Sequence, residues 1–178
     1  MKRFSMALVC LLFAAGLFAQ MPKPAPQLKE LQPFIGSSDC KGELFASPEF
    51  GPGHKIVATV TGRWILGNFW VEADFKETKT KAAPMPFHGL IFLGYDGEIK
   101  QFALGSVDNI GSYEVAGSKG WEGDVMTFEG PQHIGTATLT VRDTFTKIGT
   151  TKMNHSYSVK DKNGTWRKIE EEQCTRAK

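Results

Sequence analysis

The sequence predicts an all-β fold, a closed antiparallel up-and-down barrel of roughly eight to ten strands with a short N-terminal helix. Three observations predict it. From Ser38 onward the chain consists almost wholly of short segments rich in Val, Ile, Thr and aromatic residues, most of them alternating. Turn residues separate these segments, and no long amphipathic helix follows Phe34. Cys40 and Cys174 lie in the first and last of the predicted strands.

Residues 1–19 have the pattern of a signal peptide that is cleaved on export. Lys2 and Arg3 precede an apolar run, and Ala19 offers a small residue at the cut. The run is too short for a membrane-spanning helix, so we expect no integral membrane segment in the mature chain. The predicted location is the periplasm or the exterior of the cell.

Cleavage changes the charge and the cysteine count. Without Lys2 and Arg3, the basic residues of the chain equal the 19 acidic ones, so the net charge gives no reason to expect a nucleic acid partner. Cys10 leaves with the signal peptide. The two remaining cysteines of an exported protein most economically form one disulfide, Cys40–Cys174.

The mature chain suits one domain. Residues 20–26 read as a proline-rich tether, and residues 27–178 as a single barrel domain. Leu28, Leu31 and Phe34 recur every three residues, which is typical of a short helix with one apolar face. We expect this helix to plug one end of the barrel.

The strands follow in order along the chain. Beyond the first strand, which starts at Ser38, the predicted strands span residues 54–66, 68–78, 86–96, 100–109, 124–130, 136–146, 150–160 and 165–174. Asp96-Gly97 and Asn163-Gly164 predict tight type I′ hairpins.

The predicted disulfide supports a closed barrel independently of the strand pattern. A disulfide requires two α-carbons within about 7 Å of each other. The first and last strands of a meander are neighbours in a barrel but lie far apart in an open sheet. Closure also removes the unpaired edges that a long meander would expose.

Several segments carry a family resemblance: LQPFIGSSDCKGEL (31–44), GRWILGNFW (62–70), GLIFLGYDGEIKQF (89–102), VDN (107–109) and TVRDTFT (140–146). In these segments the chain resembles the bacterial domain-of-unknown-function family fifteen seventy-nine, of the lipocalin-like (calycin) β-barrel type. The resemblance implies a calycin-like barrel with a cavity and no assigned chemistry. Related barrels carry lipids, pigments or, in nitrobindin-like proteins, haem.

The chain departs from the calycin pattern at one position. Calycin barrels commonly open their first strand with Gly-x-Trp, whose indole packs across the barrel floor. Gly36-Ser37-Ser38 places a serine where that tryptophan would be. Either Trp64 or Phe34 fills the floor instead, or the floor is more open.

His155 is the strongest candidate for a ligand-binding residue. Met153, His155 and Tyr157 alternate along one predicted strand and so share a face, which we expect to be the barrel interior. By resemblance to the haem-binding relatives, His155 is a possible axial haem ligand. The alternative is a core histidine that is hydrogen-bonded to Tyr157 or to a backbone carbonyl.

Other polar residues allow weaker interpretations. His88 alternates with Leu90 and Phe92, so a metal site made with His155 is an alternative, although no metal-ligand spacing predicts one. Glu72 and Asp74 share one strand face, most typically a solvent-exposed one, but would make the cavity polar if they pointed inward.

Two further groups favour structural roles. Arg142 and Asp143 suggest an ion pair, or an arginine that closes one end of the barrel. Residues 170–172, three consecutive glutamates, suggest a solvated closing hairpin.

The leading functional hypothesis is the binding of a small apolar ligand in a barrel cavity. The predicted lining comes from the inward strand faces: Leu90, Phe92, Phe102, Leu104, Met153, His155 and Tyr157. The alternative is a structural or partner-binding barrel with a filled interior. An enzyme is the weakest hypothesis, because no catalytic motif, metal constellation or cofactor fingerprint other than the haem possibility is readable. Nothing in the sequence indicates an oligomeric state.

Overall fold

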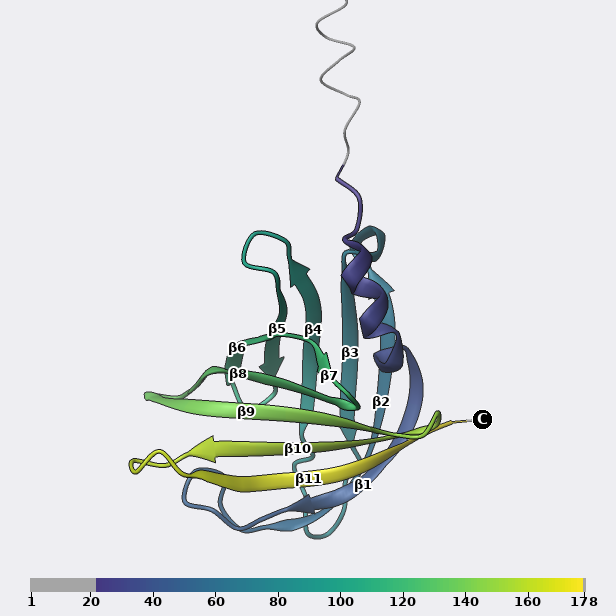
Figure 1. The fold of residues 1–178 in the computed structure, drawn as a ribbon. Helices are drawn as coiled ribbons and strands as arrows, with labels where there is room; N and C mark the ends of the chain where they lie inside the picture. The colour runs from purple at the N-terminus through teal and green to yellow at the C-terminus, as the bar shows by residue number, and fades with distance from the viewer. Residues whose placement is uncertain (1–21, 178) are drawn as a thin grey trace, which may run out of the picture.

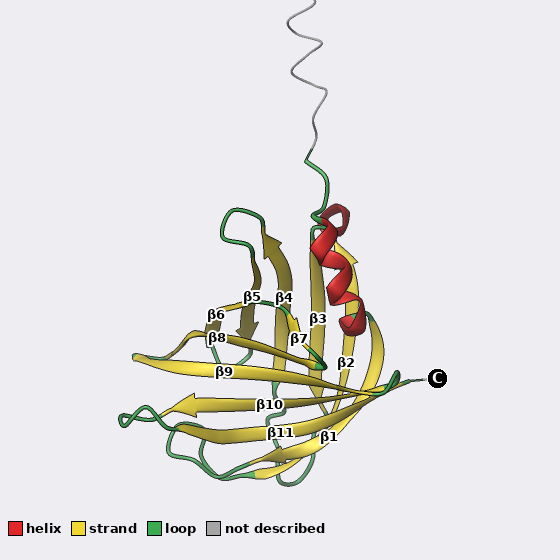
Figure 2. Cartoon of the chain, viewed as in Figure 1, coloured by secondary structure: helices red, strands yellow, loops and turns green. Residues whose placement is uncertain are grey.

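The computed structural model describes residues 22–177 of the 178-residue chain. The predicted signal peptide, residues 1–19, lies outside the described residues. Within them the chain forms an antiparallel sheet that curves round on itself, with an N-terminal 3-10 helix beside it (Figures 1 and 2). The described part contains two short 3-10 helices, and neither is long and apolar enough to cross a membrane.

The strands and helices follow one another with short connections. They are η1 (Pro26–Phe34), β1 (Gly36–Leu44), β2 (His54–Ile65), η2 (Leu66–Asn68), β3 (Trp70–Glu77), β4 (His88–Asp96), β5 (Gln101–Asp108), β6 (Tyr113–Ser118), β7 (Trp121–Glu122), β8 (Val125–Ile134), β9 (Ala137–Ile148), β10 (Lys152–Lys160) and β11 (Trp166–Arg176).

Hydrogen bonding closes the sheet into a barrel. From β1 to β6, and again from β8 to β11, each strand pairs with the next, β6 pairs with β8, and β1 pairs with β11. Ten strands of the described chain therefore form a ring, to which the two-residue β7 adds at β8. The prediction of an all-β, closed antiparallel barrel is confirmed.

The disulfide joins the two strands that close the ring. Cys40 and Cys174 are direct partners in the β1–β11 register, and their sulfur atoms are bonded. This confirms both the predicted pairing and the inference that the first and last strands are neighbours.

The sequence pattern missed β6. Its inward positions, Glu114, Ala116 and Ser118, are polar or small and buried, whereas Tyr113 and Val115 on its outer face are exposed. The strand thus inverts the usual alternation, in which apolar residues face the core. Composition alone therefore gave no strand signal here.

The connection after β4 is longer than the predicted two-residue hairpin. Four residues, 97–100, separate Asp96 from β5. The Asp96 carboxylate accepts hydrogen bonds from the backbone N–H groups of Glu98 and Ile99, at 2.8 and 3.2 Å. Asp96 is therefore explained as a turn residue.

Helix η1 supplies the side chains that fill one end of the barrel. Leu28 and Leu31 are buried in the main core, where they contact residues of the surrounding strands. The Phe34 ring stacks on Trp121 and meets Phe145 edge-on, with centroids 6.0 and 5.0 Å apart. The floor that lacks a tryptophan at position 38 is therefore filled by η1.

Candidate functional site

A cavity of about 360 Å³ remains inside the barrel. This volume is within the usual range of small-molecule pockets. Its apolar wall comes from residues on the inner strand faces: Leu44, Ile56, Val60, Phe75, Ile91, Leu93, Leu104, Phe145 and Ile169.

The rim of the cavity is apolar and exposed. It is formed by the connections β1–β2, β3–β4 and β5–β6, which contribute Phe50, Met85, Phe87 and Ile110. Met85 is 89% exposed and Ile110 is 54% exposed. Exposed apolar side chains that converge on a cavity are a common feature of ligand entrances.

On the cavity wall, three carboxyl groups lie close to one imidazole, and a fourth lies beside one of these three. Glu114 lies on β6, Asp143 on β9, His155 on β10, and Glu170 and Glu172 on β11, and all five line the cavity. Strand pairing brings them together, because His155 lies opposite Glu172 and Tyr157 lies between Asp143 and Glu170.

His155 is held by carboxyl groups on both sides of its ring. Its Nε2 lies 2.8 Å from Asp143 Oδ1, and its Nδ1 lies 3.4 Å from Glu172 Oε1 and 4.0 Å from Glu170 Oε1. The ring stacks on Phe145 with centroids 4.7 Å apart. Burial lowers the pKa of His155, but the bonds to Asp143 and Glu172 outweigh it and raise that pKa well above its ordinary value.

Two of the carboxyl groups hold protons at neutral pH. Burial, together with the neighbouring Asp143, raises the pKa of Glu114 to about 9. Burial, together with Glu172, raises the pKa of Glu170 to about 8. For both groups, burial and the neighbouring carboxyl group outweigh the positive charge of His155, which acts to lower the pKa.

Three oxygen atoms of this cluster have no hydrogen-bond partner among the described residues: Glu114 Oε1, Asp143 Oδ2 and Glu172 Oε2. Buried polar atoms without a partner cost stability and are rare in folded proteins. A protonated Glu114 that donates to Asp143 accounts for the first two atoms. Glu172 Oε2 therefore keeps acceptor capacity that a cation or a hydrogen-bond donor would satisfy.

A chain of neutral polar groups continues the cluster along the wall. The Tyr157 hydroxyl donates to Gln132 Oε1 at 2.5 Å, and Gln132 Nε2 donates to Ser112 Oγ at 3.3 Å. Burial, with the nearby acidic groups, raises the pKa of Tyr157, so the phenol stays protonated.

A second histidine–carboxyl pair ties the rim to the barrel. His54 Nε2 lies 2.7 Å from Glu77 Oε1, and Glu77 Oε2 accepts a hydrogen bond of 2.9 Å from the Phe87 N–H. Glu77 therefore fixes the connection that carries the apolar rim residues Met85 and Phe87.

The predicted lining residues divide into three groups. Leu104, Met153, His155 and Tyr157 line the cavity. Phe102 is buried in the core with Leu28 and Leu31 of η1, and it does not line the cavity.

Leu90 and Phe92 form the third group and do not line the cavity. On β4 the cavity is lined by Gly89, Ile91 and Leu93, and alternation places Leu90 and Phe92 on the opposite face. Because β4 is apolar on both faces, alternation cannot identify its inner side.

The sequence missed the acidic residues of the cluster. Asp143 points inward to His155, whereas Arg142 pairs with Glu129 at 2.6 Å, so the suggested Arg142–Asp143 ion pair is wrong. The solvated hairpin is also wrong for Glu170 and Glu172, which line the cavity. A signal for them was present in the sequence. Glu170 and Glu172 alternate with Cys174 along β11, and the disulfide of Cys174 faces the core, so all three share the inner face.

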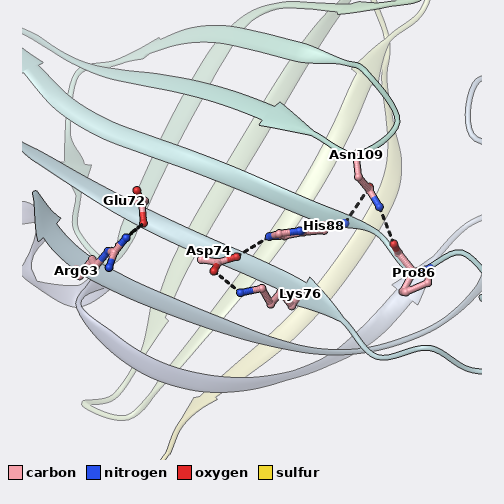
Figure 3. A network of polar contacts seen from close by, with 7 residues as sticks. All are labelled: Arg63, Glu72, Asp74, Lys76, Pro86, His88 and Asn109. Carbon is pink, nitrogen blue, oxygen red and sulfur yellow. Dashed lines mark hydrogen bonds and ion pairs between the residues drawn. The ribbon is translucent and has the colours of Figure 1, made fainter.

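The carboxylates considered at the sequence level lie outside the cavity. Glu72 pairs with Arg63, and Asp74 lies between Lys76 and His88 (Figure 3). The nitrogen–oxygen distances are 2.7 Å for the first pair and 2.5 and 2.8 Å for the other two. His88 is exposed and does not line the cavity, so the alternative metal site made of His88 and His155 is wrong. The hydrogen bond from Lys76 holds the pKa of Asp74 below its usual range.

Haem does not fit the surroundings of His155. One face of the imidazole stacks on Phe145, and both ring nitrogens point toward carboxyl groups. An iron at Nδ1 would meet Glu170 and Glu172 where the porphyrin plane has to lie.

Comparisons with known proteins agree with the fold. A family model described as "Protein of unknown function (DUF1579)" matches residues 23–176. The crystal structure of Rv2717c from M. tuberculosis superposes with a TM-score of 0.62 at 15% identity, over 88% of this chain and 100% of that chain. No curated protein matches the chain. At this identity the comparison shows that the two proteins share a β-barrel fold, and it carries no information about function.

Proposed function

The chain belongs to the DUF1579 family of proteins of unknown function, and we propose that it is an exported binding protein that holds a small, mainly apolar molecule inside its barrel. The observation that carries this proposal is the cavity of about 360 Å³ behind an exposed apolar rim. A structural barrel with a filled interior would have no such cavity.

Export is part of the proposal. The Cys40–Cys174 disulfide is compatible with an oxidising compartment, where such bonds persist. The signal-peptide pattern of residues 1–19 favours the same location.

Probe binding with a matched pair of variants tests the proposal. Ser38 lines the cavity, whereas its neighbour Ser37 is exposed on the outer face of β1. In Ser38→Trp the indole would occupy cavity volume, and in Ser37→Trp it would lie outside. The fluorescence of the neutral apolar probe N-phenyl-1-naphthylamine reports entry into an apolar site.

We expect the wild type and Ser37→Trp to bind the probe with similar affinity, and Ser38→Trp to lose most of that binding. Thermal unfolding of both variants, followed by circular dichroism, verifies that each is folded. Equal probe binding by Ser38→Trp and the wild type, or no binding by the wild type, would contradict the proposal. Ser106→Leu, a smaller change on the cavity wall, replaces Ser38→Trp if the tryptophan prevents folding.

A further inference from the structure

We propose that His155, Glu170 and Glu172 form a binding site for a divalent metal ion of the zinc class on the inner wall of the barrel. The inference goes beyond the proposed binding of an apolar molecule and does not depend on it. It rests on the distances between the three side chains, on the orientation of the imidazole, and on the unpartnered oxygen of Glu172.

The spacing of the three side chains fits a metal ion. One ligand atom from each residue can be chosen so that all three lie within 4.8 Å of one another. The His155 Nδ1 atom lies 3.4 Å from Glu172 Oε1 and 4.0 Å from Glu170 Oε1. Zinc bonds of about 2.0–2.1 Å in a tetrahedron place ligand atoms roughly 3.4 Å apart. Small side-chain movements would bring all three into coordination, with release of the protons that His155 Nδ1 and Glu170 hold in the metal-free chain, because metal ligands must be deprotonated.

Asp143 orients the imidazole as metal sites require. A metal-ligating histidine usually donates its other ring N–H to a carboxylate, which fixes the tautomer and the ring direction. Nε2 of His155 lies 2.8 Å from Asp143 Oδ1, so Nδ1 is the nitrogen directed at the two glutamates. Asp143 is the positioning residue of this site.

The second, independent observation is an unsatisfied oxygen. The Glu172 side chain is only 5% exposed, lines the cavity, and has no partner for its Oε2 atom within residues 22–177. The imidazole of His155 lies 3.4 Å from Glu172 Oε1 and leaves the other oxygen of this carboxyl group without a partner among the described residues. A cation bound between Glu172 and Glu170 would supply the missing partner.

The donor set favours zinc among the divalent ions. One imidazole nitrogen and two carboxylate oxygens are a borderline set that suits Zn²⁺ better than Ca²⁺ or Mg²⁺, which prefer oxygen alone. Cys40 and Cys174 lie close by, but their sulfurs are bonded to each other and are not available as ligands. Three protein ligands leave a fourth position for water or a bound molecule.

The test uses the disulfide-bonded chain without a histidine tag, after removal of metals with a chelator. Zn²⁺ alone is titrated by calorimetry, and Co²⁺ alone is followed by its visible absorption, whose intensity distinguishes tetrahedral from octahedral coordination. We expect one ion per chain and a tetrahedral cobalt spectrum. No binding of either ion, or an octahedral cobalt spectrum, would overturn the proposal.

Neighbouring residues on β11 supply a matched pair of variants. Glu172→Gln removes a ligand inside the barrel, whereas Glu171→Gln changes an outward side chain that pairs with Lys168. We expect Glu172→Gln to weaken zinc binding by more than about 100-fold and Glu171→Gln to leave it unchanged. Equal affinity in both variants would locate the zinc elsewhere, for example at His54 or His88, and would refute the site.

Two more variants keep the test decisive if Glu172→Gln does not fold. Glu170→Gln should also weaken zinc binding strongly. Asp143→Asn should weaken it by about 10–100-fold while one ion per chain still binds, because Asp143 orients His155 without touching the metal. Unchanged zinc affinity in folded Glu170→Gln and Asp143→Asn would overturn the proposal.

Discussion

Gly42 of β1 lies directly opposite Glu172 of β11, and Glu172 occupies the space where a side chain at position 42 would lie. A Cβ atom added at Gly42 would lie 2.1 Å from the Glu171 carbonyl oxygen and 2.6 Å from the Glu172 Cα and Cβ atoms. The closing strands therefore approach each other closely at the point where Glu172 enters the barrel.

Gly42→Ala should destabilise the barrel. The added methyl group meets backbone atoms that cannot move without disturbing the β1–β11 pairing, and overpacking of this kind costs about 1–3 kcal/mol. The free energy of unfolding, measured in urea with the disulfide intact, should fall by that amount. Gly97→Ala is the matched control, because no atom of the described part of the chain, apart from its immediate neighbours, lies within 4 Å of its added Cβ. Equal stability of the two variants would contradict the close approach.

The stability of the folded barrel should fall as the pH rises from 6 to 8. The pKa of Glu114 is about 9 in the barrel, against the ordinary value of 4.5. Between these values the folded chain holds a proton that the unfolded chain has lost. Each such proton lowers the free energy of unfolding by about 1.4 kcal/mol per pH unit. His155 acts in the same direction, because its pKa is also raised in the folded chain.

Glu114→Gln isolates the contribution of one group to this pH dependence. The variant keeps the size and polarity of the side chain but cannot titrate, so the slope should decrease by about 1.4 kcal/mol per pH unit. Urea unfolding at pH 6, 7 and 8, with a chelator present, measures it. The exposed Glu122→Gln serves as control and should keep the wild-type slope. A Glu114→Gln slope equal to that of the wild type would show that Glu114 is not protonated in the barrel.

The overall fold was predictable because most strands carry a local sequence signal and the two cysteines carry a long-range one. Alternating β-branched and aromatic residues identify strands, and the pairing of Cys40 with Cys174 identifies their closure into a ring. The sequence did not predict β6, because the residues on its inner face are polar or small. A periodicity argument assumes an apolar interior, and β6 violates it where it contributes Glu114 to the cavity.

The candidate site was predictable only in part for the same reason. His155 and Tyr157 have apolar neighbours at alternate positions, so their strand was correctly oriented. Glu170 and Glu172 lie within a run of three glutamates, which resembles a solvent-exposed strand in composition. Charged residues are almost never buried without a partner, so the burial of Glu114, Asp143 and Glu172 beside the half-buried Glu170 contradicts the expectation for these residue types. Such exceptions are expected at functional sites.

Helix η1 should contribute to stability as a core element of the barrel, and Leu31→Ala measures that contribution. Leu31 is fully buried and packs in the main core together with Phe102 and Phe128. Its truncation leaves a cavity at the filled end of the barrel, which should lower the free energy of unfolding by about 2–5 kcal/mol. The exposed neighbour Gln32→Ala should change it by less than about 0.5 kcal/mol. If both variants unfold at the same urea concentration as the wild type, η1 does not contribute to the core. The strands alone would then fill the end of the barrel that lacks a tryptophan at Ser38.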